Sequence, residues 1–273
     1  MNKNASLKNR MLGYENVTNT RLTRRTPVIL RLDMRSGHSF TKGFDKPFDD
    51  VFITSMQQTM AYLCSNIQGC VLGYHQSDEI TLVLIDYQSI DTDAWFDYRV
   101  QKLCSVTSSM ATMAFNKYFY ENVNAFESCN YELGLMDDRK KELGNIYWDA
   151  VEKGAMFDAR CFNIPKEEVV NALIYRQQDC TRNSIQMLGQ SEFSSKALHG
   201  KNQSQIQDML MLELGINWND LDTYKKRGSC CIKETFYADN IERTIWKIDT
   251  NIPIFTQDRY YIERFIYIEK KAE

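Results

Sequence analysis

The sequence predicts an α+β fold built around a strand–helix–strand–strand–helix–strand core. Two patterns lead to this prediction. Short runs rich in valine, isoleucine and leucine are typical of buried strands, and the longer segments between them carry apolar residues at helical spacing. With 273 residues, of which 43% are hydrophobic and 25% charged, the chain is also long enough to bury a sizeable core.

The first predicted strand and a predicted hairpin both carry acids. The strand covers 28–33 and ends in Asp33, whereas the hairpin covers 70–85 and holds Asp78 and Glu79 in its polar turn. In a core of this order the strand and the hairpin can lie side by side, so we expect Asp33 and Asp78 at neighbouring positions of one sheet. Paired acids on a rigid sheet are a common means of holding a hard cation.

The rest of the core follows from periodicity, capping and turn residues. Asp49 or Asp50 can cap the first helix. The expected elements are a helix over 51–66, a helix over about 94–120, a surface excursion with local helix over 122–153, and a strand over 155–164. The loop after the first strand is small and polar, and its Gly37 is free to adopt a positive φ, which suits backbone amides that face an anion. The whole order is that of a ferredoxin-like, or split βαβ, arrangement.

The C-terminal part predicts a helix-hairpin lobe, over about 166–273, that packs on the core of about 25–165 within one domain spanning 1–273. The expected elements are a helix over 166–187, a break over 189–195, a helix over 204–214 capped by Gly215, a hairpin of 230–236 with 244–248, and an aromatic-rich strand over 259–268.

Charge and cysteine content restrict the function. The net charge of −3 excludes a chain that binds polyanions over its whole surface, so a nucleic-acid site must be a local basic patch. The early arginines Arg21, Arg24 and Arg25 are interpreted as a solvated helix and loop. None of the eight cysteines shows C-x-x-C spacing, and no apolar run reaches membrane-spanning length. We expect a reduced, cytoplasmic protein without a membrane anchor.

Six short motifs, in order along the chain, resemble those of the tRNA-His guanylyltransferase family. They are Arg31–Phe40, Lys46-Pro47-Phe48-Asp49, Gln76-Ser77-Asp78-Glu79, Phe157-Asp158-Ala159-Arg160, Arg176-Gln177-Gln178-Asp179-Cys180 and Lys226-Arg227-Gly228. The residues Thr181-Arg182-Asn183-Ser184, which follow the fifth motif, differ from the branch dedicated to tRNA-His. The later segments 189–193 and 198–201 look like the guanylyltransferase-like branch.

This resemblance implies a fold and an activity. The family has a βαββαβ core similar to a polymerase palm, and its members are nucleotidyltransferases that add nucleotides in the 3′–5′ direction to the 5′ end of tRNA. The guanylyltransferase-like branch performs template-directed tRNA 5′-end repair. The expected cofactors are two Mg²⁺ ions, the substrates are tRNA with ATP and GTP or another NTP, and the expected assembly is a homo-tetramer.

The resemblance also assigns roles to residues. Asp33, Asp78 and Glu79 are the candidate catalytic residues, and Asp33, Asp78 and the backbone carbonyl of Met34 are the candidate metal ligands. Met34 stands where the family pattern has glycine. The candidate nucleotide-binding residues are Asp33, Met34, Arg35, Ser36, Gly37, His38, Lys46, Asp49, Ser77, Asp78 and Lys102. The candidate tRNA-binding residues are Arg176, Asp179, Asn183, Lys226 and Arg227.

Two alternatives share this fold class. A nucleotide cyclase has a similar core and similar metal chemistry, but the G-G-D/E-E-F type of hairpin is absent from the sequence. A non-catalytic RNA-binding member would keep the fold without the chemistry, and Met34 is the reason to consider it. An ordinary RNA-binding ferredoxin-like domain would instead carry exposed aromatic residues on its sheet.

Overall fold

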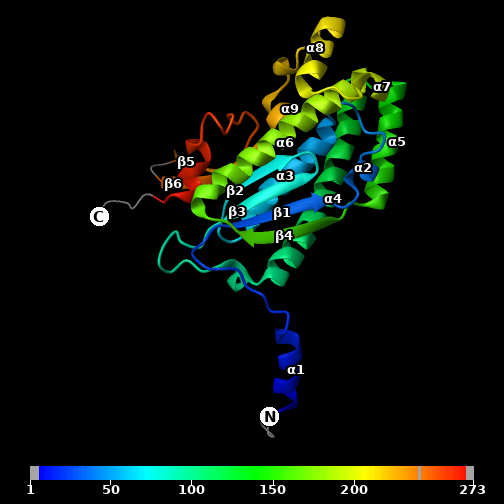
Figure 1. Cartoon of the computed structure of the whole chain (residues 1–273). Coiled ribbons are helices and arrows are strands. Elements are labelled where there is room, and N and C mark those ends of the chain that lie inside the picture. Colours follow the sequence, from blue (N-terminus) through cyan, green and yellow to red (C-terminus); the bar gives the residue numbers. More distant parts are fainter. Residues whose placement is uncertain (1–5, 239–240, 269–273) are drawn as a thin grey trace.

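The computed structural model describes residues 6–238 and 241–268. It shows a mixed α/β fold around one six-stranded antiparallel sheet in the order β4-β1-β3-β2-β5-β6 (Figure 1). The strands are β1 (Val28–Met34), β2 (Cys70–Gln76), β3 (Glu79–Leu84), β4 (Phe157–Asn163), β5 (Ser229–Ala238) and β6 (Ile241–Asp249). The predicted strand–helix–strand–strand–helix–strand order of the N-terminal part is confirmed.

Helices cover the two faces of the sheet unequally. They are α1 (Leu7–Asn16), α2 (Gly37–Phe40), α3 (Asp50–Asn66), α4 (Val100–Glu132), α5 (Asp138–Lys153), α6 (Lys166–Glu192), α7 (Ser195–Leu198), α8 (Gln203–Leu214), α9 (Thr223–Arg227) and α10 (Tyr260–Ile266), with the 3₁₀ turns η1 (Trp95–Tyr98) and η2 (Trp218–Asp220). Figure 1 shows α3 and α4 behind the sheet and α6 crossing in front of it, with α1 extending away from the body.

The alternation of side chains along β1 decides which residues reach the front face. Val28, Leu30, Leu32 and Met34 join the hydrophobic core beneath α3 and α4. The intervening residues point to the opposite face, where Ile29 packs into the smaller core beneath α6 and α10. Asp33 therefore lies on the front face, at the end of the strand.

Several predicted boundaries are wrong. Residues 122–153 are no surface excursion, because α4 continues to Glu132 and α5 follows it. Tyr147 of α5 is buried in the main core. The predicted break over 189–195 falls largely inside α6, and the predicted strand over 259–268 contains α10. The predicted C-terminal hairpin is confirmed as β5 and β6, and it extends the core sheet because β5 pairs with β2.

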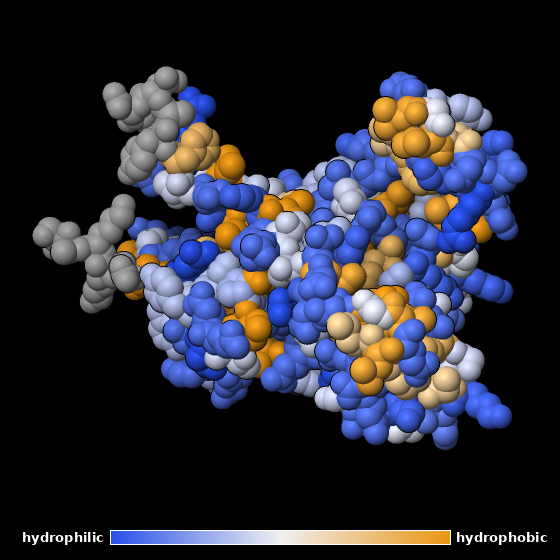
Figure 2. All heavy atoms as spheres, turned by 90° about the horizontal axis from the view of Figure 1, so that it is seen from above, coloured by the Kyte–Doolittle hydropathy of each residue, from blue (hydrophilic) through white to orange (hydrophobic). Residues whose placement is uncertain are grey.

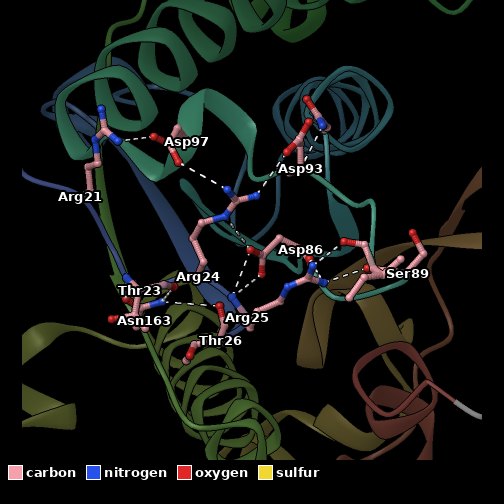
Figure 3. A network of polar contacts seen from close by, with 12 residues as sticks. Arg21, Thr23, Arg24, Arg25, Thr26, Asp86, Ser89, Asp93, Asp97 and Asn163 are labelled. Atoms are coloured by element: carbon pink, nitrogen blue, oxygen red, sulfur yellow. Dashed lines mark hydrogen bonds and ion pairs between the residues drawn. The ribbon is translucent and has the colours of Figure 1, made fainter.

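The arginines ahead of β1 form an ion-pair cluster and are not simply solvated. In Figure 3, Arg24 lies between Asp86, Asp93 and Asp97, and Arg21 reaches Asp97. The backbone N–H of Arg25 donates to the buried carboxylate of Asp86 at 2.9 and 3.1 Å. Because Asp86 follows the end of β3, this cluster lies at the end of the sheet opposite the hairpin turn.

The surface carries exposed hydrophobic side chains in separate patches. Figure 2 views the molecule from the end where α8 projects, and it shows such patches there among hydrophilic residues. On α8 itself, Leu212 is 84% exposed. Within the described part of the chain, no helix is both long enough and apolar enough to cross a membrane. All eight cysteines lie in that part and are free thiols.

Candidate active site

Three segments converge where β1 ends. Asp33 pairs with Glu79 across the β1–β3 ladder, which brings it beside Asp78 in the adjoining turn, as predicted. The backbone N–H of Met34 donates to the carbonyl of Asp78 at 3.1 Å. The loop after β1 returns to the same turn, because Gly37 packs so closely on the Asp78 carboxylate that a Cβ there would collide with it. The absent side chain of Gly37 thus allows the loop and the acid to meet.

Within the part of the chain that the structure describes, the carboxylates of Asp33 and Asp78 have no ion-pair partner of their own, because the nearby Arg31 and Arg160 pair with Glu79 and Asp158. Among the described residues, neither accepts a side-chain hydrogen bond or forms an ion pair closer than the usual 4 Å limit. Burial, together with the carboxylates of Asp78 and Asp158, raises the pKa of Asp33, and Arg160 and Arg31 oppose that rise only in part. Negative charge held in this way favours binding of a cation.

These residues fit a magnesium site that the substrate completes. The described residues contain no group of three or more histidine, cysteine or acidic side chains arranged to hold a metal ion. Mg²⁺ requires fewer protein ligands than that, since it is commonly bound by one or two carboxylates together with substrate phosphates and water. Two uncommitted carboxylates on one sheet edge meet this requirement.

Met34 does not obstruct the site. Its side chain is only 2% exposed and belongs to the main core, because strand alternation directs it away from Asp33. A methionine in place of glycine therefore adds bulk to the core and none to the front face.

The loop after β1 offers donors to an anion. Ser36, and not Gly37 as expected, takes the left-handed conformation with φ 58°. The backbone N–H groups of Ser39 and Phe40 both donate to the Ser36 carbonyl, whereas those of Ser36, Gly37 and His38 donate to no described residue. The side chains of Arg35, Ser36 and His38 are exposed.

Comparison with known proteins agrees with this geometry. A family model described as tRNAHis guanylyltransferase matches residues 8–165. The chain belongs to this family. It is a nucleotidyltransferase of the tRNAHis guanylyltransferase family, as the motifs predict.

The relatives also support the predicted branch. The fold is similar to that of a bacterial tRNA(His) guanylyltransferase-like protein in complex with ATP, with 40% identity over 97% of this chain and 100% of that chain and a TM-score of 0.82. A structure of such a protein in complex with GTP is 36% identical over 96% of this chain and 100% of that chain, with a TM-score of 0.77. A probable tRNA(His) guanylyltransferase of Dictyostelium discoideum is 24% identical over 238 residues, which cover 81% of this chain and 80% of that protein.

Glu79, the second acid of the family's Q-S-D-E turn, is committed to arginines. Arg176 donates from Nε to Oε1 at 2.8 Å and from Nη2 to Oε2 at 2.9 Å, and Arg31 lies 3.8 Å from Oε2. Burial raises the pKa of Glu79, and the two guanidinium groups oppose that rise. Glu79 therefore differs from Asp78 in having its charge already neutralised.

A buried histidine that the sequence reasoning missed supports the turn. His75 donates from Nε2 to the Ser77 carbonyl at 2.8 Å, and its Nδ1 lies 3.4 Å from the Ser229 hydroxyl. Ser77 adopts a positive φ of 49° and is exposed. Burial lowers the pKa of His75 to about 4, so the ring is neutral at pH 7. A lone histidine in an apolar strand beside a polar turn is the only sequence signal for it.

The structure separates Lys102 from the acids and gives Asp49 other partners. Lys102 lies on the first turn of α4, about 15 Å along the helix from Thr112, whose Oγ1 accepts from Phe157 N near the site. Asp49 is buried and caps α3, and it accepts the Tyr147 hydroxyl at 2.6 Å. Lys46 is exposed in the loop before α3.

The candidate tRNA-binding residues of the C-terminal part fall into two groups, those with partners inside the protein and those that are exposed. Lys226 is buried and donates from Nζ to the Asn219 carbonyl, which suits a structural role. Desolvation lowers its pKa. Arg227 accepts the Tyr74 hydroxyl at its carbonyl at 2.7 Å, and only its side chain is available for RNA. Asn183 is exposed on α6, whereas Arg176 and Asp179 pair with each other.

Proposed function

We propose that this chain adds nucleotides in the 3′–5′ direction to the 5′ end of tRNA and serves template-directed 5′-end repair. The observation that supports this most directly is the pair of carboxylates, Asp33 and Asp78, that lie together, without an ion-pair partner among the described residues, where β1 ends on the front face of the sheet. The βαββαβ order of the core supports the likeness to a polymerase palm. The ATP and GTP complexes of the guanylyltransferase-like relatives support nucleotide substrates.

The reaction proceeds in two transfers. The tRNA 5′-monophosphate attacks the α-phosphorus of ATP or GTP, pyrophosphate leaves, and a nucleotidylated 5′ end results. The 3′-hydroxyl of an incoming NTP then attacks the 5′ phosphorus and displaces the nucleoside monophosphate. A 5′-triphosphorylated end needs no activation, because pyrophosphate is then the leaving group.

The chain positions charge in this reaction and forms no covalent bond. Asp33, Asp78 and the Met34 carbonyl would hold two Mg²⁺ ions, which lower the pKa of an attacking hydroxyl and stabilise a leaving phosphate when bound. The free amides of Ser36, Gly37 and His38 suit a triphosphate, and the exposed side chain of Arg35 adds positive charge beside them.

The assay is direct. Incubation with 5′-monophosphorylated, 5′-truncated tRNA, ATP, labelled NTPs and Mg²⁺ is expected to give RNA extended at its 5′ end. Comparing full-length tRNA-His that has not yet received its extra guanosine with 5′-truncated tRNAs distinguishes the two branches of the family. The branch dedicated to tRNA-His should extend the first, and the repair branch should extend the second. Absence of product with every tRNA would refute the proposal, and cyclic nucleotide formed without tRNA would indicate the cyclase alternative. A tetrameric assembly and a cytoplasmic location remain predictions.

A further inference from the structure

A two-point ion pair on the front face of the sheet joins helix α6 to the catalytic hairpin. Arg176 and Glu79 form two parallel hydrogen bonds, Nε to Oε1 at 2.8 Å and Nη2 to Oε2 at 2.9 Å. Their side chains are only 14% and 12% exposed. Two-point pairing of this kind fixes orientation as well as distance, and only arginine supplies it.

Glu79, whose carboxylate Arg176 holds, lies at the start of β3 beside the candidate metal ligand Asp78. Glu79 directly follows Asp78, and its backbone pairs with Asp33 on one side and Gln76 on the other. Fixing the Glu79 side chain therefore fixes the strand end from which Asp78 projects. Arg31 adds a second positive charge near Glu79, at 3.8 Å, on the same face.

The charge of Arg176 is already satisfied inside the protein. Its Nη2 also donates to Asp179 Oδ2 at 3.1 Å, so two carboxylates neutralise one guanidinium. The other oxygen of Asp179 accepts from Arg182 at 2.8 Å, and the Arg182 side chain is 52% exposed. A largely buried and doubly paired arginine is poorly suited to neutralise an RNA phosphate, whereas Arg182 remains accessible.

We propose that Arg176 is a positioning residue that acts through Glu79, aligning the β2–β3 turn so that Asp78 faces Asp33, and that it makes no contact with tRNA. This inference rests on the proposed function for its catalytic readout. It assigns the two acids of the turn different tasks: Asp78 would bind the metal that holds the substrate phosphates, and Glu79 anchors the turn to α6. Helix α6 then serves as the support of the metal site.

Kinetics with variants of one helix test the proposal. Arg176→Gln is expected to lower turnover at saturating tRNA by about ten-fold to a hundred-fold, since small displacements of reacting groups carry costs of that size. It should raise the Mg²⁺ concentration needed for half-maximal rate while the KM for tRNA stays within about two-fold. The matched control is Arg182→Gln, six residues further along α6 at the exposed end of the same network, which should leave both turnover and the Mg²⁺ requirement unchanged.

Two further variants protect the test against misfolding and against indirect effects. Arg176→Lys keeps the charge but not the two-point contact, so it should fold and still lose part of the turnover. The double variant Glu79→Gln with Arg176→Gln should be no worse than the more impaired single variant, because both remove the same contact. A raised KM for tRNA with unchanged turnover and Mg²⁺ requirement, or losses that add in the double variant, would overturn the proposal.

A binding measurement separates this proposal from the proposed function. Electron paramagnetic resonance of free Mn²⁺, titrated with protein in the presence of ATP, reports metal binding without any turnover. Arg176→Gln and Arg176→Lys should bind Mn²⁺–ATP more weakly than the wild-type chain, and Arg182→Gln should bind it equally well. Weakened binding in a chain that extends no tRNA would refute the proposed function alone, whereas equal binding by all four proteins would refute the positioning role.

Discussion

The two ends of the β1–β3 pair carry acid clusters that differ in one respect. At the end where β1 begins, Asp86 is fully buried and meets Arg24 and the backbone N–H of Arg25. At the end where β1 finishes, Asp33 and Asp78 lie together without such partners. The first cluster is neutralised by the chain itself, and the second needs a cation from outside.

The comparison shows that the acid itself does not determine the role; the counter-charge supplied by the fold does. The same distinction recurs within the hairpin turn, where Arg176 neutralises Glu79 and nothing comparable reaches Asp78. A carboxylate that the fold leaves unpaired costs stability, and such a cost is expected at a functional site.

The largest expected effect is loss of activity at the uncompensated end. Asp78→Asn or Asp33→Asn should reduce 5′ extension by more than about 10³-fold, because each removes a charge that metal and phosphate binding require. The free energy of unfolding should stay the same or rise, since repulsion between the two carboxylates is relieved. Gel assays and urea denaturation measure the two quantities. A variant that unfolds but keeps its activity when folded would reverse the assignment.

The opposite outcome is expected at the neutralised end. Asp86→Asn should lower the free energy of unfolding by about 2–3 kcal/mol, because it replaces buried charged hydrogen bonds with weaker ones. Turnover per folded molecule should stay within about two-fold, since the two ends are far apart. Urea denaturation with activity scaled to the folded fraction checks both. Loss of turnover without loss of stability would show that the two clusters are coupled.

The pH dependence of stability tests the support of the turn. The folded pKa of His75, about 4, lies below the ordinary value of 6.5. The stabilisation is therefore complete above pH 6.5 and is lost as pH falls toward 4. This group alone should cost about 2 kcal/mol between pH 7 and pH 5.

His75→Gln keeps a donor for the Ser77 carbonyl and removes the titration, so its stability should fall less over that range. The raised pKa values of Asp33, Asp49 and Glu79 act in the opposite direction. They are common to both proteins, and the difference between the two urea-denaturation curves isolates His75. Parallel curves from pH 7 to pH 5 would contradict the prediction.

The smallest effect should come from the rim of the neutralised cluster. The Asp93 side chain is 84% exposed and meets Arg24 at 3.3 Å. Asp93→Asn should change the free energy of unfolding by less than about 0.5 kcal/mol, because water screens exposed pairs. A loss as large as that of Asp86→Asn would mean that the cluster acts as one unit.

The sequence alone predicts the elements that local patterns specify. The strand ending in Asp33, the hairpin around Asp78 and the Asp49 cap are predictable from the sequence, because alternation and capping depend on neighbouring residues. The aromatic residues of 259–268 predict a strand, yet Tyr261, Ile262 and Ile266 form a buried helical face. Tertiary packing decided between the two.

The parts of the site that could not be predicted depend on contacts between distant segments. The pairing of Glu79 with Arg176 spans 97 residues, and nothing near either residue indicates the partner. The placement of Lys102 far from the acids follows from where α4 begins, which the unexpected η1 turn sets. The family motifs nevertheless place both acids in one site, because the resemblance covers segments that are distant in the sequence.

The burial of Met34 beside Asp33 has a consequence for how this chain tolerates change. Met34 points into the packed core, whereas Asp33, the residue before it, points into the site. Substitutions at the two positions are therefore limited by different requirements. In a library of substitutions at position 34, stability should follow the size and hydrophobicity of the new side chain, as in any packed core. A library at position 33 should be sorted by whether the new side chain places a negative charge where Asp33 holds it. The methionine in place of glycine therefore changes how the core is packed, and its side chain does not reach the site of Asp33 and Asp78.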